Sequence, residues 1–316
     1  MKFRNISILL LMASLLGLSS CSEDALDDKS IFDDVAKPEQ NDFDKWLETN
    51  YRKAFNIDFK YRYSDKESDL SYNVIPADYD KSVALAILVK HVWLEAYAEA
   101  ISPEFVKTYV PRIIQLTGSY KWNSNGSQVL GTAEGGLKVM LYGVNELDID
   151  NPRINTTNPY ESHQVKPGDP IDMNYWFFHT MHHEFCHILT QKKEYDTAFR
   201  AISASTYHAT DWVNLEDKKV AKEGFVTSYA SSEYNEDFAE IYATYITNTA
   251  EGWQKILDAA GTNGTAVLNQ KLDLMKKYFK DSWNVDLDDM RTIVLRRSAE
   301  SVNLDLHTLN QNATEQ

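Results

Sequence analysis

Basic residues are fewer than acidic residues in this chain. Its 316 residues include 32 Lys and Arg against 47 Asp and Glu, which gives a formal net charge of −15. The phosphate backbone of a nucleic acid would be repelled by this excess of carboxylates, because affinity for that backbone comes from clustered Lys and Arg. We therefore expect no nucleic-acid partner.

Long apolar runs are also scarce. The run at residues 6–18 is too short to span a bilayer, and it follows Lys2 and Arg4 as in a signal peptide. The letters LSSC at 18–21 end this run and resemble a bacterial lipobox. By that resemblance, residues 1–20 are a lipoprotein signal peptide and Cys21 becomes a lipidated N-terminus that anchors the protein to a membrane. The alternative is an ordinary secreted protein with a chance cysteine.

Cysteine is the rarest residue, since Cys186 is the only one besides Cys21. With Cys21 lipidated, no internal disulfide can form, and stability must come from a hydrophobic core. Residues 22–40 (SEDALDDKSIFDDVAKPEQ) are acidic and poor in aromatics, which predicts a solvated tether at 21–40. The acidic stretch also resembles the surface-export signal of Bacteroidetes lipoproteins, although a plain acidic linker looks the same. The expected location is the bacterial outer membrane, at the cell surface or the periplasmic face.

Residues 41–316 contain strand-like segments that precede most of the helices. Apolar residues at helical spacing predict helices at 43–55 and 80–100, the second capped by Asp80. Residues 110–144 alternate in polarity or run β-branched between Asn-Gly and Gly-Gly turns, which predicts two to four strands.

Helices are expected to dominate from residue 172 onward. Asp172 is the expected cap of a helix that reaches about Lys192, and later helices are expected at 235–248, 252–260, 270–279 and 287–299. A small sheet followed by helices is the order of an α+β fold. We expect a single domain with an N-terminal α/β lobe to about residue 195 and a helical C-terminal lobe.

Histidine is concentrated in one place. The chain has eight histidines, and four lie within nine positions: His179, His182, His183 and His187. His183, Glu184 and His187 form the pattern H-E-x-x-H, which on a helix places both imidazoles on one face. Two such imidazoles can bind one metal ion, with Glu184 at the edge of the site. The alternative is a pair of buried histidines with ordinary hydrogen bonds.

A zinc site of this kind usually needs a third protein ligand. The extended metzincin motif would require Gly and His where this chain has Thr190 and Lys193, so that family is excluded. Further along, residues 227–244 read TSYASSEYNEDFAEIYAT, and Glu236 and Glu240 lie four apart on an expected helix. Ligand count favours Glu236 as the third ligand, which is the His, His, Glu set of a gluzincin. Otherwise Glu236 would be a first-turn carboxylate that favours the helix dipole.

HEFCH followed by this segment resembles the catalytic region of gluzincins of the anthrax lethal factor type. In those proteins a tyrosine lies seven residues before the ligand glutamate of a Glu-x-Phe-Ala-Glu pattern, as Tyr229 lies before Glu236. The chain resembles more closely the zinc-binding metallopeptidase lipoproteins of Bacteroidetes, through LSSC, HEFCH, GFVTSYA (224–230) and EDFAE (236–240). The resemblance implies a zincin-like α+β fold, bound Zn²⁺, a peptide or protein substrate, and a role beside a TonB-dependent outer-membrane transporter system.

The residues then take distinct roles. His183, His187 and Glu236 would bind zinc, and Glu184 would act as the general base. Tyr229 could donate a hydrogen bond to the oxyanion, and Glu240 would fix a ligand imidazole.

Other polar residues near the motifs are given lesser roles. His208 or Asp211 could fix the ligand imidazole in place of Glu240, although a polar loop is the more common reason for such residues. His179 and His182 are expected off the ligand face, in structural roles, and Cys186 is expected on the packing side.

Two functions remain open from the sequence. The first is a lipid-anchored zinc peptidase that cleaves peptides or proteins. The second is a non-catalytic lipoprotein of a nutrient-uptake system, stabilised by zinc, which could bind glycans. The presence of Glu184 favours the enzyme, because a structural zinc site has no use for a base. A strand at 137–142 could border the cleft and pair with an extended peptide, or it could be an ordinary strand of the sheet.

Overall fold

The computed structural model of the protein describes residues 39–63, 73–163 and 169–309. The expected signal peptide, Cys21 and nearly all of the tether lie outside the described residues. The expected division into lobes near residue 195 stays a prediction.

Helical segments at the start of the domain pack into its core. Helix α2 (Asp42–Leu47) continues into the π-helical turn η1 (Glu48–Lys53), and its cap is Asn41, whose side chain accepts the Asp44 amide. Helix α3 (Tyr79–Val89), the π-helical turn η2 (Lys90–Leu94) and α4 (Glu95–Ala100) follow one another without a break. A short helix, α5 (Pro103–Tyr109), comes next. These elements confirm the helices expected at 43–55 and 80–100.

The expected cap of α3 is wrong by two residues. The helix begins after Asp78, and Asp80 lies in its first turn. The backbone amide of Asp78 donates to the Asn145 side chain at 2.8 Å, and the carbonyl of Asp78 accepts the Ser82 amide at 2.9 Å. This tertiary contact with Asn145, which the local sequence does not reveal, sets where the helix starts.

Four strands form the main sheet, in the order β1 (Asp58–Lys60), β2 (Ile113–Leu116), β6 (Lys138–Leu141) and β5 (Gly131–Glu134). β1, β2 and β6 are parallel, and β5 is antiparallel to β6. β3 (Lys121–Trp122) and β4 (Gln128–Val129) form a separate hairpin. The expected two to four strands between 110 and 144 are therefore too few, because the hairpin adds two strands of two residues each.

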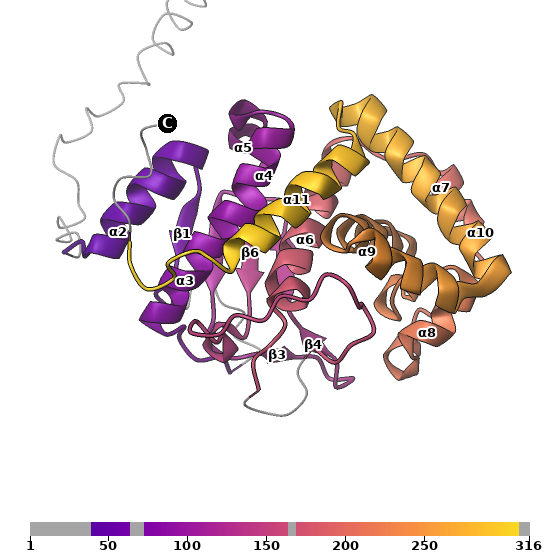
Figure 1. The fold of residues 1–316 in the computed structure, drawn as a ribbon, viewed down its shortest axis with the longest axis horizontal. Helices are drawn as coiled ribbons and strands as arrows, with labels where there is room; N and C mark the ends of the chain where they lie inside the picture. Colours follow the sequence, from indigo (N-terminus) through magenta and orange to yellow (C-terminus); the bar gives the residue numbers. More distant parts are fainter. Residues whose placement is uncertain (1–38, 64–72, 164–168, 310–316) are drawn as a thin grey trace, which may run out of the picture. The chain divides into compact units, whose positions relative to one another are not determined.

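The histidine-rich segment is helical, as expected. Asp172 caps it, since its side chain accepts the backbone amides of Asn155 and Asn174 at 3.0 and 3.1 Å. The π-helical turn η4 (Asn174–His179) leads into α6 (Thr180–Lys192). Helix α6 packs against β5 on one side and against α9 (Tyr234–Thr247) on the other, so that it lies between the sheet and the later helices (Figure 1).

Short helical segments connect α6 to α9. They are α7 (Ala198–Ile202), η5 (Trp212–Asn214), α8 (Asp217–Val220), η6 (Ala221–Glu223) and η7 (Tyr229–Ser231). Another short turn, η3 (Val144–Glu146), follows the sheet.

Two long helices complete the chain, α10 (Ala250–Trp283) and α11 (Leu287–Ser301). The helices expected at 252–260 and 270–279 are the two halves of α10, which is broken at Gly261, where φ is +63°. A glycine accepts this left-handed conformation without the steric penalty of a Cβ atom. With all strands of the described residues before α6 and mainly helices after it, the α+β class is confirmed. In the described part of the chain, no helix is both long and apolar enough to cross a membrane.

Candidate metal centre

Two histidines of α6 and one glutamate of α9 converge on a single point. His183 Nε2 lies 3.0 Å from Glu236 Oε2, and His187 Nε2 lies 3.2 Å from the same oxygen. The two Nε2 atoms are 3.0 Å apart. One helical turn separates the histidines, and the packing of α6 against α9 brings the carboxylate to them.

This cluster fits a zinc ion. Tetrahedral zinc with bonds of about 2.0–2.1 Å to N and O keeps its ligand atoms roughly 3.3–3.5 Å apart, and the three distances here are only slightly shorter. Burial alone would raise the pKa of Glu236, but its hydrogen bonds to His183 and His187 hold that pKa well below the ordinary value. Glu236 is therefore an anion at neutral pH, as a zinc ligand must be.

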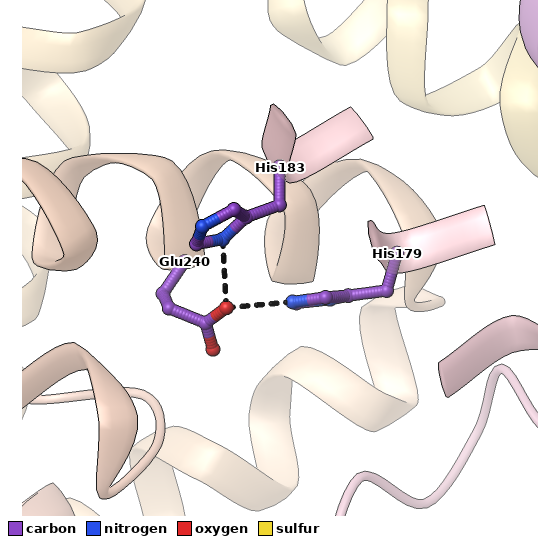
Figure 2. Close-up of side chains that lie close together, drawn as sticks. All are labelled: His179, His183 and Glu240. Carbon is purple, nitrogen blue, oxygen red and sulfur yellow. Dashed lines mark hydrogen bonds and ion pairs between the residues drawn. The ribbon is translucent and has the colours of Figure 1, made fainter. Parts of the chain in front are cut away.

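Glu240 contacts the other nitrogen of His183. Its Oε1 lies 2.8 Å from His183 Nδ1 and 2.9 Å from His179 Nε2, and Figure 2 shows both contacts meeting at one carboxylate oxygen. Thr227 Oγ1 donates to the second oxygen at 2.6 Å. Burial opposes ionisation, but His179 and His183 hold the pKa of Glu240 well below its usual range. A carboxylate held in this way orients His183 so that its Nε2 would be free to bind a metal.

The expectation that His179 lies off the ligand face is wrong. His179, His183 and His187 follow one another at intervals of four residues, so all three stack along the same side of the helix. His179 shares Glu240 with His183, and these three residues form a second group that could hold a metal. We assign the ion to the His183, His187 and Glu236 group, because there both histidines of the H-E-x-x-H pair point Nε2 at one carboxylate oxygen.

Glu184 lies next to the cluster and is nearly buried, with 8% of its surface exposed. Burial raises the pKa of its carboxyl, and the neighbouring His183 and His187 oppose that rise. It also accepts a hydrogen bond from the backbone of Ala133 in β5. A carboxylate with a raised pKa beside a metal site is suited to accept and release a proton near neutral pH.

Tyr229 also lies beside the cluster, and it lines the same two cavities as Glu184. Its ring centroid is 6.0 Å from that of His183 and 4.9 Å from that of Trp212. Burial and the Glu236 carboxylate, to which the hydroxyl is hydrogen-bonded, raise the pKa of Tyr229 far above 10. The hydroxyl therefore stays protonated and can donate a hydrogen bond.

Two cavities open beside the cluster. We call them the Asp217 cavity, of about 570 Å³, and the Arg200 cavity, of about 740 Å³, and both are lined by Gly131, His183, Glu184 and Tyr229. Gly131 belongs to β5, which ends the sheet order next to the cavities. Of the two alternatives for strand 137–142, the ordinary sheet strand is confirmed, because β6 pairs on both sides, with β2 and β5.

The remaining polar candidates lie away from the metal group. His208 contacts Glu223 at 2.8 Å and Asp211 at 3.5 Å, which is the polar loop expected as the alternative. His182 is fully buried, with Nδ1 2.9 Å from the Tyr97 hydroxyl, in agreement with a structural role.

The thiol of Cys186 is buried as well, and this burial raises its pKa well above the ordinary value. It therefore stays protonated and packs in the core, where the sequence places it.

Sequence reasoning missed the part played by His179 and Thr227. His179 could have been found from its spacing of four residues before His183. Thr227 carries no such signal, because its contact with Glu240 depends on how the loop before α9 folds back onto that helix.

Comparison with known proteins agrees with a zinc-binding role. Residues 36–288 match the family described as "Putative zinc-binding metallo-peptidase". The chain belongs to this family. A crystal structure described as a "putative zinc-binding metallo-peptidase" from Bacteroides caccae is 44% identical, with a TM-score of 0.69, and the match covers 85% of this chain and 95% of that one. Among curated proteins, no match was found.

Proposed function

We propose that the protein is a zinc-dependent peptide hydrolase of the gluzincin type. The observation that carries this proposal is the buried Glu184 beside a group of three zinc-type ligands, where it lines two cavities. His183, His187 and Glu236 would hold the ion. A metal that served structure alone would have no use for a buried, unliganded carboxylate at this position.

Each residue then has a chemical task in the hydrolysis. Zinc supplies Lewis acidity, which polarises a carbonyl and acidifies water. Glu184 takes a proton from the attacking water and passes it to the leaving amine, so that a C–O bond forms as the peptide C–N bond breaks. Tyr229 donates a hydrogen bond to the oxyanion. Glu240 keeps His183 in the tautomer and orientation that metal binding requires.

β5 supports a peptide as the substrate. It has a strand partner, β6, on one side in the main sheet, and it borders both cavities beside Glu184. An extended peptide that pairs with such an edge gains backbone hydrogen bonds regardless of its sequence. This pairing would lay a peptide carbonyl across the metal group.

The cellular setting rests on the N-terminal sequence and on the resemblance of the chain. The letters LSSC at 18–21 support lipidation of Cys21, with the domain tethered to the bacterial outer membrane. The resemblance to import-associated lipoproteins supports a place beside a TonB-dependent transporter system. The competing proposal, a zinc-stabilised binding lipoprotein, accounts for the same anchor but not for Glu184.

Hydrolysis of a peptide library by the zinc-loaded protein tests the proposal. Glu184→Gln should lower the rate by at least ~10²-fold, the usual scale for a lost general base. Tyr229→Phe should lower it by roughly 10²–10³-fold, the value of one oxyanion donor. Both variants should keep their zinc, since neither side chain is among the three proposed ligands.

A matched control is Glu216→Gln, which removes a surface carboxylate that pairs with Lys219 at 2.9 Å. It should behave as wild type. If the zinc-loaded protein cleaves nothing in the library, the binding-protein alternative replaces the enzyme. If Glu184→Gln cleaves as fast as wild type, the mechanism is wrong.

A further inference from the structure

The Asp217 cavity has an unusual combination of walls. Aromatic rings of Tyr175, Trp176 and Trp212 line it beside the metal group, and Asp217 contributes a carboxylate. Among the described residues that line it, none is Lys or Arg. A cavity with aromatic faces and carboxylates but no Lys or Arg is suited to a cation.

Asp217 is not neutralised by a basic partner. Its Oδ1 accepts the backbone amide of Ser228 at 2.7 Å, and no Lys or Arg of the described residues forms an ion pair with it. The two lysines that follow it in α8 have other partners. Lys218 Nζ lies 5.0 Å from the centroid of the Tyr160 ring, and Lys219 pairs with Glu216.

Two histidines of the cavity, His163 and His179, contact carboxylates other than that of Asp217. His179 Nε2 is already engaged by Glu240, and His163 Nδ1 lies 3.8 Å from the Asp172 carboxylate. The ring of His163 is stacked on Tyr175 with centroids 3.5 Å apart. Neither imidazole forms a hydrogen bond or an ion pair with Asp217, and burial raises the pKa of this carboxyl by more than the attraction of His163 lowers it.

Burial makes binding of a cation to the Asp217 carboxylate more favourable. It raises the pKa of Asp217, and hydrogen bonds from Ser228 oppose the rise. The ionised form has thus lost part of its hydration, and a cation in the cavity would restore the lost interaction. The net charge of −15 adds a long-range attraction for basic peptides.

The position of the cavity indicates which side chain of a peptide it would take. Val129 and Gly131 border both cavities, but Leu130, just before β5, borders only the Asp217 cavity, whereas Thr132 and Ala133 border only the Arg200 cavity. The Asp217 cavity therefore lies toward the start of β5. An antiparallel partner of β5 runs the opposite way. Its residues after the metal group would lie toward Gly131, over the Asp217 cavity.

We propose that the Asp217 cavity selects a Lys or Arg side chain directly after the scissile bond of the peptide, with Asp217 as the specificity-determining residue. This inference rests on the proposed function for the position of the cleaved bond. It assigns the leaving half of the substrate a basic N-terminal residue.

Matched peptides that differ only at that position, with Lys or norleucine, provide the test. The zinc-loaded wild type should cleave the Lys peptide with a kcat/KM roughly 10–100-fold higher, the scale of a hydrogen bond to a charged group. Asp217→Asn keeps an oxygen for the Ser228 amide, and it should reduce the Lys-to-norleucine ratio by a similar factor. Asp211→Asn, which removes an exposed carboxylate of the preceding loop, should leave the ratio unchanged.

The outcomes separate this inference from the proposed function. Cleavage without a preference for Lys, or a ratio that survives Asp217→Asn, overturns the inference and leaves the hydrolase standing. If neither of these peptides nor any peptide of the library is cleaved, the hydrolase fails, and binding of the same two peptides to the zinc-loaded protein decides the inference. Tighter binding of the Lys peptide that Asp217→Asn abolishes would support it, and equal binding would reject it.

Discussion

Glu236 and Glu240 lie one turn apart on α9, and both reach His183, but at different ring nitrogens. Glu236 Oε2 lies 3.0 Å from Nε2, and Glu240 Oε1 lies 2.8 Å from Nδ1. This difference separates a metal ligand from a residue that orients the ligand. The sequence could place both glutamates on one stripe through their spacing, but the nitrogen that each contacts depends on how α9 packs against α6.

The first prediction concerns the third ligand. Glu236→Ala should lose most of the bound zinc, because two histidines alone leave the ion with one protein ligand fewer than a usual catalytic site. Zinc per chain in the purified protein measures this. Glu233→Ala is the matched control, since Glu233 is exposed and precedes the same helix without joining the group. Unchanged zinc in Glu236→Ala would move the ligand role to another residue, with Glu240 first.

Residue types and spacing were enough to predict the proposed ligands. His183 and His187 follow from H-E-x-x-H, and the structure brings Glu236 to both of them. The same reasoning wrongly removed His179 from that face, although its spacing is the same. Asp217 carried no signal in the sequence, because a cavity forms only when α8, the loop before α9 and the hairpin meet.

Among the elements, α9 is held by a buried ion pair next to the proposed ligand. Lys271 Nζ on α10 lies 2.6 Å from Asp237 Oδ2, and both side chains are fully buried. Lys271 also donates to the Gly224 carbonyl at 2.8 Å, and Tyr207 donates to Asp237 at 2.9 Å. Burial raises the pKa of Asp237 and lowers that of Lys271, so each charge depends on the other. The pair fixes the start of α9, where Glu236 is located.

The second prediction is that Lys271→Met destabilises the protein by about 3–5 kcal/mol, the cost of leaving one buried charge without its partner. Urea unfolding would measure the free energy. Lys277→Met removes an exposed pair with Asp281 on the same helix and should cost less than about 1 kcal/mol. The double variant Lys271→Met, Asp237→Leu should recover much of the loss. If Lys271→Met and Lys277→Met lowered the free energy of unfolding equally, the buried pair would stabilise the protein no more than the exposed one.

Helices were predicted better than strands. Apolar residues at intervals of three and four marked every long helix, although the break at Gly261 inside α10 appeared as a gap between two helices. The strands are short, and β3 and β4 have only two residues each, too few for an alternating pattern to be recognised. The edge position of β5 follows from the strand order, which no local pattern contains.

For the whole molecule, the family match agrees with a zinc-binding metallopeptidase, and a location outside the cytoplasm stays a prediction. The net charge of −15 argues against nucleic acid, and the family match over residues 36–288 covers nearly the entire folded part. The anchor at Cys21 lies outside the described residues, so its support remains the sequence LSSC at 18–21.

The third prediction tests this anchor. Cys21→Ser should move the protein from the membrane fraction to the soluble fraction, because a serine cannot carry the thioether-linked lipid. Fractionation of cells that express each form measures the change. Cys186→Ser is the matched control, since its thiol is buried in the core. Continued membrane association of Cys21→Ser would show that the lipobox interpretation is wrong.

The location of the bound ion tests the central claim most directly. Crystals of the zinc-loaded protein would provide an anomalous difference map at the zinc absorption edge. The account predicts one strong peak at about 2.0–2.2 Å from His183 Nε2, His187 Nε2 and a carboxylate oxygen of Glu236. A peak between His179, His183 Nδ1 and Glu240, or no peak at either group, would contradict it.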